Sequence, residues 1–133
     1  ELDGVYSFPL LHPAFCQQIL QCNEDFAAFV REQGLEGTFH SERPAVLDLM
    51  RLGWLNDLLM ERVVSPLAEI LFEDELQGAA LDWRHGFVVS YAPHADEERE
   101  GMGPRRNHLV PHTDDAEVTL NVCLQSDYEG GAL

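Results

Sequence analysis

The triplet His112-Thr113-Asp114 and the alternating run Glu117-Val118-Thr119-Leu120-Asn121-Val122-Cys123-Leu124 decide how this chain is interpreted. Side chains two positions apart in an extended segment leave from the same face, with alpha carbons about 6 to 7 Å apart. The His112 imidazole and the Asp114 carboxylate can therefore converge on one cation. One nitrogen and one oxygen ligand of this kind belong to the 2-His-1-carboxylate facial triad, which holds non-heme Fe(II) and leaves coordination positions open. We predict that both residues are metal ligands.

Further motifs surround the triplet in a definite order. They are Phe87-Val88-Val89-Ser90-Tyr91, the loop after it, the triplet, the alternating run and Gly130-Gly131-Ala132-Leu133. In this order they resemble the 2-oxoglutarate- and iron(II)-dependent oxygenases, in particular the branch related to prolyl 4-hydroxylase and lysyl hydroxylase domains. An HxD triplet alone arises often by chance. Its combination with this run and the Gly-Gly pair makes the resemblance fairly specific.

The resemblance implies a fold. Members of the family form a double-stranded β-helix, a jelly roll of about eight strands. We therefore expect an α+β chain, with a mainly helical support region at residues 1–83 and the N-terminal part of the jelly roll at residues 84–133. The family's distal histidine and the basic residue that pairs with 2-oxoglutarate are expected beyond Leu133. On this interpretation the chain is cut short at its C-terminus and is inactive by itself.

The resemblance also implies roles for individual residues. His112 and Asp114 would hold Fe(II), and Tyr91 matches the family tyrosine whose hydroxyl donates to a 2-oxoglutarate oxygen. Asn121 matches an inward position beside the cosubstrate, and asparagine is depleted in strand interiors, which favours a role in the site. The implied reaction is oxidative decarboxylation of 2-oxoglutarate to succinate and CO2, coupled to hydroxylation of a C–H bond. We expect a protein or amino-acid side chain as substrate and ascorbate as a further cofactor.

The alternating run predicts a strand with two unlike faces. We expect the apolar face to pack against the helices or an opposing sheet, and the polar face to line the cofactor cavity. Thr119 and Cys123 on the polar face are expected to contact the ligand residues without binding the metal themselves. The apolar face holds Val118, Leu120, Val122 and Leu124, and the polar face holds Thr119, Asn121, Cys123 and Gln125.

Several alternatives stay open at this point. His112 and Asp114 could form a surface pair at a turn, Asp115 could compete as ligand, and His108 could replace the third ligand if the chain bent sharply at Pro111. The chain could also be a degenerate binding module without catalysis, or a cupin-like protein that uses another metal.

Charge and composition exclude some classes of function. With 8 basic residues against 24 acidic ones, the formal net charge is −16 and no basic stripe is available for a phosphate backbone. We therefore expect no nucleic-acid partner, and no apolar run is long enough to predict a membrane span. The composition does not indicate a compartment, and cytosol or nucleus is the default.

Hydrophobic periodicity predicts the remaining elements. Apolar residues at intervals of three and four predict a helix from Pro13 to Gln33. A second helix is predicted from Trp54 to Phe72, with Pro66 kinking it or starting a new piece. Ala45–Leu49 is expected to form a short strand, with a helix as the alternative. Cys16 and Cys22 are expected to fill the core, and His12, His40, His85 and His94 to face solvent or cap helices.

Overall fold

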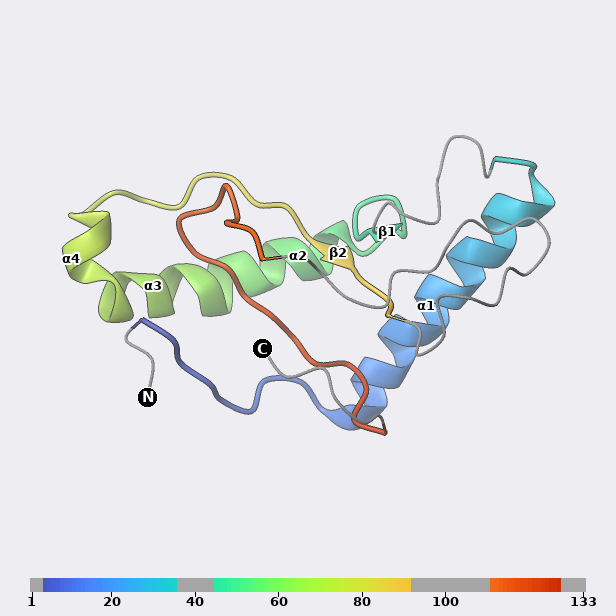
Figure 1. Ribbon diagram of the computed structural model, residues 1–133, viewed down its shortest axis with the longest axis horizontal. Coiled ribbons are helices and arrows are strands. Elements are labelled where there is room, and N and C mark those ends of the chain that lie inside the picture. Colours follow the sequence, from blue (N-terminus) through green and yellow to red (C-terminus); the bar gives the residue numbers. More distant parts are fainter. Residues whose placement is uncertain (1–3, 36–44, 92–110, 128–133) are drawn as a thin grey trace.

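The computed structural model describes residues 4–35, 45–91 and 111–127 (Figure 1). A long helix, α1 (Pro13–Glu32), precedes a short strand, β1 (Ala45–Val46). Helix α2 (Gly53–Leu59), the π-helical segment η1 (Met60–Val64) and helix α3 (Ser65–Leu71) follow one another as a single rod (Figure 1). The short helix α4 (Glu73–Leu76) and strand β2 (Phe87–Val88) complete the order of elements. Within these ranges no helix is both long and apolar enough to cross a membrane.

Helix α1 confirms the first predicted helix. It begins after His12, whose ring nitrogen Nδ1 accepts a hydrogen bond from the Ala14 backbone N–H at 3.2 Å, so this histidine is a cap as expected. Cys16 is buried and Cys22 packs against the core, which confirms their predicted roles. Phe29, which continues the apolar spacing of this helix, is 52% exposed. The cluster around Ile19 reaches along α1 as far as Phe26, and Val30 beyond it is also buried.

The second predicted helix is present, and Pro66 starts a new piece of it. Proline has no N–H to donate to the carbonyl four residues earlier, and its ring collides with that carbonyl. The turn before Pro66 is wider, because the Ser65 N–H bonds to the carbonyl of Met60 five residues back. Pro66 then lies in the first turn of α3, where a missing N–H has no cost. The rod continues through the proline by changing its hydrogen-bond register.

Strands β1 and β2 form an antiparallel pair, with Ala45 opposite Val88 and Val46 opposite Phe87. The prediction of a strand at Ala45–Leu49 is confirmed for its first two residues. After Val46 the chain turns, with the Leu49 N–H bonded to the Val46 carbonyl at 3.0 Å. Because β1 ends there, the motif Phe87–Tyr91 is paired only over Phe87–Val88.

The run Glu117–Leu124 alternates as predicted but is not paired. Within the described ranges it carries no ladder hydrogen bonds, so it is not a β-strand there. Its burial still follows a period of two: the apolar side chains are half-buried and the polar ones are exposed. Leu124 packs against the core, which confirms the expected contact between the apolar face and the helices at this position. The jelly roll itself stays a prediction.

The core joins the three described parts of the chain. Ile19 of α1, Met50 and Leu52 of the turn after β1, and Leu55 of α2 form its buried centre. Leu11, Phe15, Cys22, Phe26, Leu47, Leu59, Val88 and Leu124 pack around them. The burial of these side chains fixes α1, the strand pair and the run Glu117–Leu124 relative to α2.

Next to this core, Arg84 connects the residues just before β2 with α2. Its Nη1 donates to both carboxylate oxygens of Asp48, at 3.0 and 2.8 Å. Its Nε donates to Oδ1 of Asp57 at 2.7 Å. With the amide of Asn56 oriented to suit its neighbours, its oxygen accepts from the Gly86 N–H and from Arg84, each at 3.1 Å. Asn56 is the buried polar side chain of this region, and these bonds satisfy it.

Gly86 must be a glycine because the backbone passes directly over Asn56. A Cβ at this position would lie 2.7 Å from the Asn56 amide and 2.8 Å from a methyl group of Leu47. We predict that Gly86→Ala lowers the free energy of unfolding by about 1–3 kcal/mol, measured by urea denaturation. Gly34→Asn is the control, because a Cβ there meets nothing within 4 Å and asparagine tolerates its φ of +64°. Equal effects of the two variants would contradict this account.

Arg84 also makes stability depend on pH. The pKa of Asp48 lies below its ordinary value of 3.8. The largest cause is the hydrogen bond from Arg84, and the positive charge of Arg84 lowers this pKa further. A carboxyl group with a lowered folded pKa adds stability above that ordinary value and loses it as the pH falls through the folded pKa. We predict that Arg84→Gln destabilises the fold at neutral pH, and that its deficit shrinks below about pH 3.8.

Urea denaturation of both proteins between about pH 7 and pH 2 measures this deficit. Arg62→Gln is the matched control, since Arg62 pairs with Glu61 on the exposed surface at 3.3 Å. A deficit for Arg84→Gln that stays constant with pH would contradict the role given to Asp48.

Candidate metal centre

His112 and Asp114 face one another. The imidazole Nε2 lies 3.1 Å from Oδ1 of the carboxylate, and each side chain is 47% exposed. The two residues stand in an irregular segment just before the alternating run, whose Leu124 is anchored in the core. The sequence prediction that these two side chains converge is thus met by their geometry.

The spacing of the two donor atoms fits a shared divalent metal. Imidazole nitrogen and carboxylate oxygen bind such ions at about 2.1 Å, so two of them at right angles lie about 3.0 Å apart. The observed separation of 3.1 Å is close to that value. A nitrogen and a hard oxygen donor are also the ligand types that non-heme Fe(II) takes. Without a metal, the same separation is that of a hydrogen bond.

Thr119 contacts the other oxygen of the same carboxylate. Its hydroxyl Oγ1 donates to Oδ2 of Asp114 at 2.8 Å. Asp114 therefore has its two oxygens engaged differently, one toward His112 and one by a hydroxyl. The predicted role of Thr119 as a residue that contacts a metal ligand stays a prediction.

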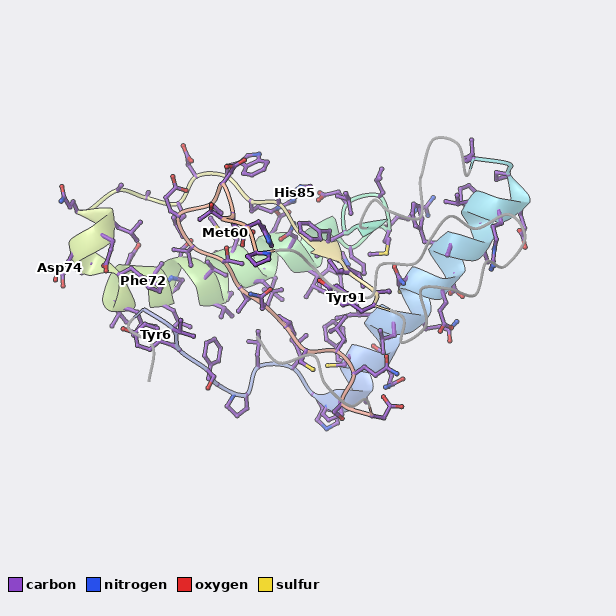
Figure 2. The ribbon with its side chains drawn as sticks, viewed as in Figure 1. Tyr6, Met60, Phe72, Asp74, His85 and Tyr91 are labelled. Atoms are coloured by element: carbon purple, nitrogen blue, oxygen red, sulfur yellow. The ribbon has the colours of Figure 1, made fainter. Side chains whose placement is uncertain are left out.

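Tyr91, Asn121 and Cys123 are the other candidate residues that the structure describes. Tyr91 is 50% exposed at the end of the segment that follows β2 (Figure 2). Asn121 is exposed on the polar side of the alternating run. Within the described residues, no hydrogen bond joins either of them to His112 or Asp114. The Cys123 thiol donates to the Gln125 carbonyl at 2.9 Å. The roles of Tyr91, Asn121 and Cys123 stay predictions.

A third ligand is not present in the part of the chain that the structure describes. No group of three His, Cys, Asp or Glu side chains there could hold a metal. Asp115 is exposed and is not part of the contact between His112 and Asp114. His108, the alternative ligand, lies outside the described residues, as do His40, His94 and the Gly130–Leu133 motif.

One residue that matters for this region was missed from the sequence. Arg84 was not singled out, yet it joins Asp48, in the turn after β1, to Asp57 of α2. A usable signal was available. In the extended stretch Trp83-Arg84-His85-Gly86-Phe87, the odd positions are aromatic and exposed, so the cation falls on the opposite, inward face.

Comparison with known proteins gives matches over almost the whole chain. The chain is 38% identical over 137 residues to the 2-oxoglutarate and iron-dependent oxygenase domain-containing protein CP2 of Arabidopsis thaliana, covering 98% of this chain and 31% of that protein. It is 34% identical over 133 residues to the 2-oxoglutarate and iron-dependent oxygenase domain-containing protein 2 of Homo sapiens, covering 100% of this chain and 35% of that protein.

The comparisons support the 2-oxoglutarate and iron(II) oxygenase superfamily. A further relative, the oxygenase domain-containing protein ICU11 of Arabidopsis thaliana, is 31% identical over 133 residues. The chain spans about a third of the length of these relatives. No family model matches the chain, and no solved structure matches it.

The neighbouring aspartates provide a test of the ligand assignment. We predict that Asp114→Asn weakens Fe(II) binding by the whole protein more than about tenfold, because the amide keeps the shape but loses the charged donor. Asp115→Asn, with the same change one residue away, should leave the affinity within about threefold. Anaerobic titration with Fe(II) measures both affinities. A larger loss of affinity for Asp115→Asn would show that Asp115, and not Asp114, is the metal ligand.

Proposed function

We propose that this chain is part of an Fe(II)- and 2-oxoglutarate-dependent oxygenase, and that His112 and Asp114 hold its iron. The observation that carries the proposal is the 3.1 Å approach of the imidazole Nε2 to the carboxylate Oδ1 in the predicted triplet. The relatives named as 2-oxoglutarate and iron-dependent oxygenase domain-containing proteins support it independently.

The residues of this chain have defined tasks in this proposal. His112 would bind through Nε2 and Asp114 through Oδ1, both from one short segment, so that a third ligand completes one face and the opposite face stays open. Tyr91 and Asn121 would orient the cosubstrate through their polar groups. When bound, the iron would supply the oxidising chemistry, in which O2 gives one oxygen atom to succinate as 2-oxoglutarate loses CO2 and the other to a substrate C–H bond.

The finer parts of the proposal concern fold and substrate. We propose that the run Glu117–Leu124 belongs to a jelly roll, and that the substrate is a protein or amino-acid side chain, as in the prolyl and lysyl hydroxylase branch. Ascorbate would serve as a further cofactor. The strict alternation of half-buried and exposed side chains along the run supports the first point, because a strand of a jelly roll has this pattern.

Succinate release tests the proposed reaction. The whole protein, supplied with Fe(II), 2-oxoglutarate and oxygen, should release succinate, and His112→Ala should reduce the rate at least about 100-fold because one iron ligand is lost. His85→Ala is the control, since His85 is exposed and stacks on Trp83 with ring centroids 5.8 Å apart. Full activity of His112→Ala would refute the ligand assignment. Bound metal without succinate would favour a cupin-like protein, and absence of both would favour a binding module.

A further inference from the structure

We infer that Thr119 is a positioning residue that makes Asp114 bind its metal through one oxygen only. This inference rests on the proposed function and adds a role for a residue that does not touch the metal. The two oxygens of Asp114 already differ: Oδ1 lies 3.1 Å from Nε2 of His112, and Oδ2 accepts the Thr119 hydroxyl at 2.8 Å. The contact with Thr119 is shorter than the contact with His112.

The number of oxygens that bind matters because a carboxylate can use one or both of them. A carboxylate that binds with both oxygens takes two coordination positions, and a facial triad needs its remaining positions open for cosubstrate and oxygen. An oxygen that accepts an O–H···O⁻ hydrogen bond has one lone pair occupied and is less available to a cation. The Thr119 hydroxyl thus reserves Oδ1 for the metal and keeps Oδ2 away from it.

Position 119 suits this task for two reasons. It lies on the exposed side of the run whose opposite side chains, among them Val118 and Leu120, are half-buried, and the run is anchored by Leu124 in the core. The hydroxyl is therefore carried by a segment that packing holds in place. Threonine is also β-branched, so its χ1 is restricted and the direction of its hydroxyl is better defined than that of a serine.

Metal titration of four proteins tests the inference. They are the whole protein, Thr119→Val, Thr119→Ser, and Thr113→Val as the matched control. Thr113 also has a hydroxyl beside Asp114 in sequence, but within the described residues it makes no hydrogen bond. We expect Thr119→Val to raise the Kd for Fe(II), measured without oxygen, by about 10- to 100-fold, as is typical when the hydrogen-bond partner of a ligand is removed. Thr119→Ser and Thr113→Val should stay within about threefold of the unmodified protein.

The visible spectrum of the Co(II)-loaded protein provides a second reading that a merely structural role would not change. We expect Thr119→Val to alter the intensity of the cobalt bands, because the coordination of Asp114 changes, and Thr119→Ser to restore them. If Thr119→Val does not fold, Thr119→Ala is measured in the same way.

The outcomes separate this inference from the proposed function. An unmodified protein that binds neither Fe(II) nor Co(II) would overturn both. An unmodified protein that binds iron, with a Thr119→Val variant of equal affinity and unchanged cobalt spectrum, would overturn the role of Thr119 alone. A folded Thr119→Ser variant that loses as much affinity as Thr119→Val would also overturn it, because the hydroxyl would then not be the group that acts.

Discussion

The described parts of this chain are held together by the buried cluster of Ile19, Met50, Leu52 and Leu55, and a polar link beside it is made by the guanidinium of Arg84. It links the turn after β1, through Asp48, with α2, through Asp57, and its planar fork of donors suits two carboxylates at once. The same contacts raise the pKa of Arg84 and lower that of Asp48, with the hydrogen bond between them as the largest cause in both. Leu124 of the alternating run packs against the buried core cluster. The run that follows the candidate ligands is therefore held by the packing of Leu124 against this core.

Local patterns predicted the helices well. The apolar spacing in α1 and the break at Pro66 are properties of neighbouring residues, and both are present as expected. Phe29 shows where this reasoning ends. It continues the apolar spacing of the helix, but its burial depends on whether another part of the chain covers it, and among the described residues none does so fully. Periodicity tells which face a residue takes, and packing between distant segments decides whether that face is covered.

In the candidate site, too, local features were predicted and contacts between separate segments were not. The convergence of His112 and Asp114 follows from a spacing of two residues, so the sequence was sufficient to predict it. The alternation from Val118 to Leu124 is likewise local and is seen in the burial, although no neighbouring strand pairs with it among the described residues. Contacts of Tyr91 with the ligands depend on how two separate parts of the chain pack together, because Tyr91 lies in a different described range from His112 and Asp114. Arg84 was missed for this reason too, since its partners are 27 and 36 residues away.

The structure of the whole protein crystallised with Mn(II) in place of Fe(II) tests the central claim most directly. The account predicts one ion bound by both Nε2 of His112 and Oδ1 of Asp114, with each bond about 2.1 Å long and Oδ2 left out of the coordination. An ion bound elsewhere, or these two side chains turned away from each other around different partners, would contradict it.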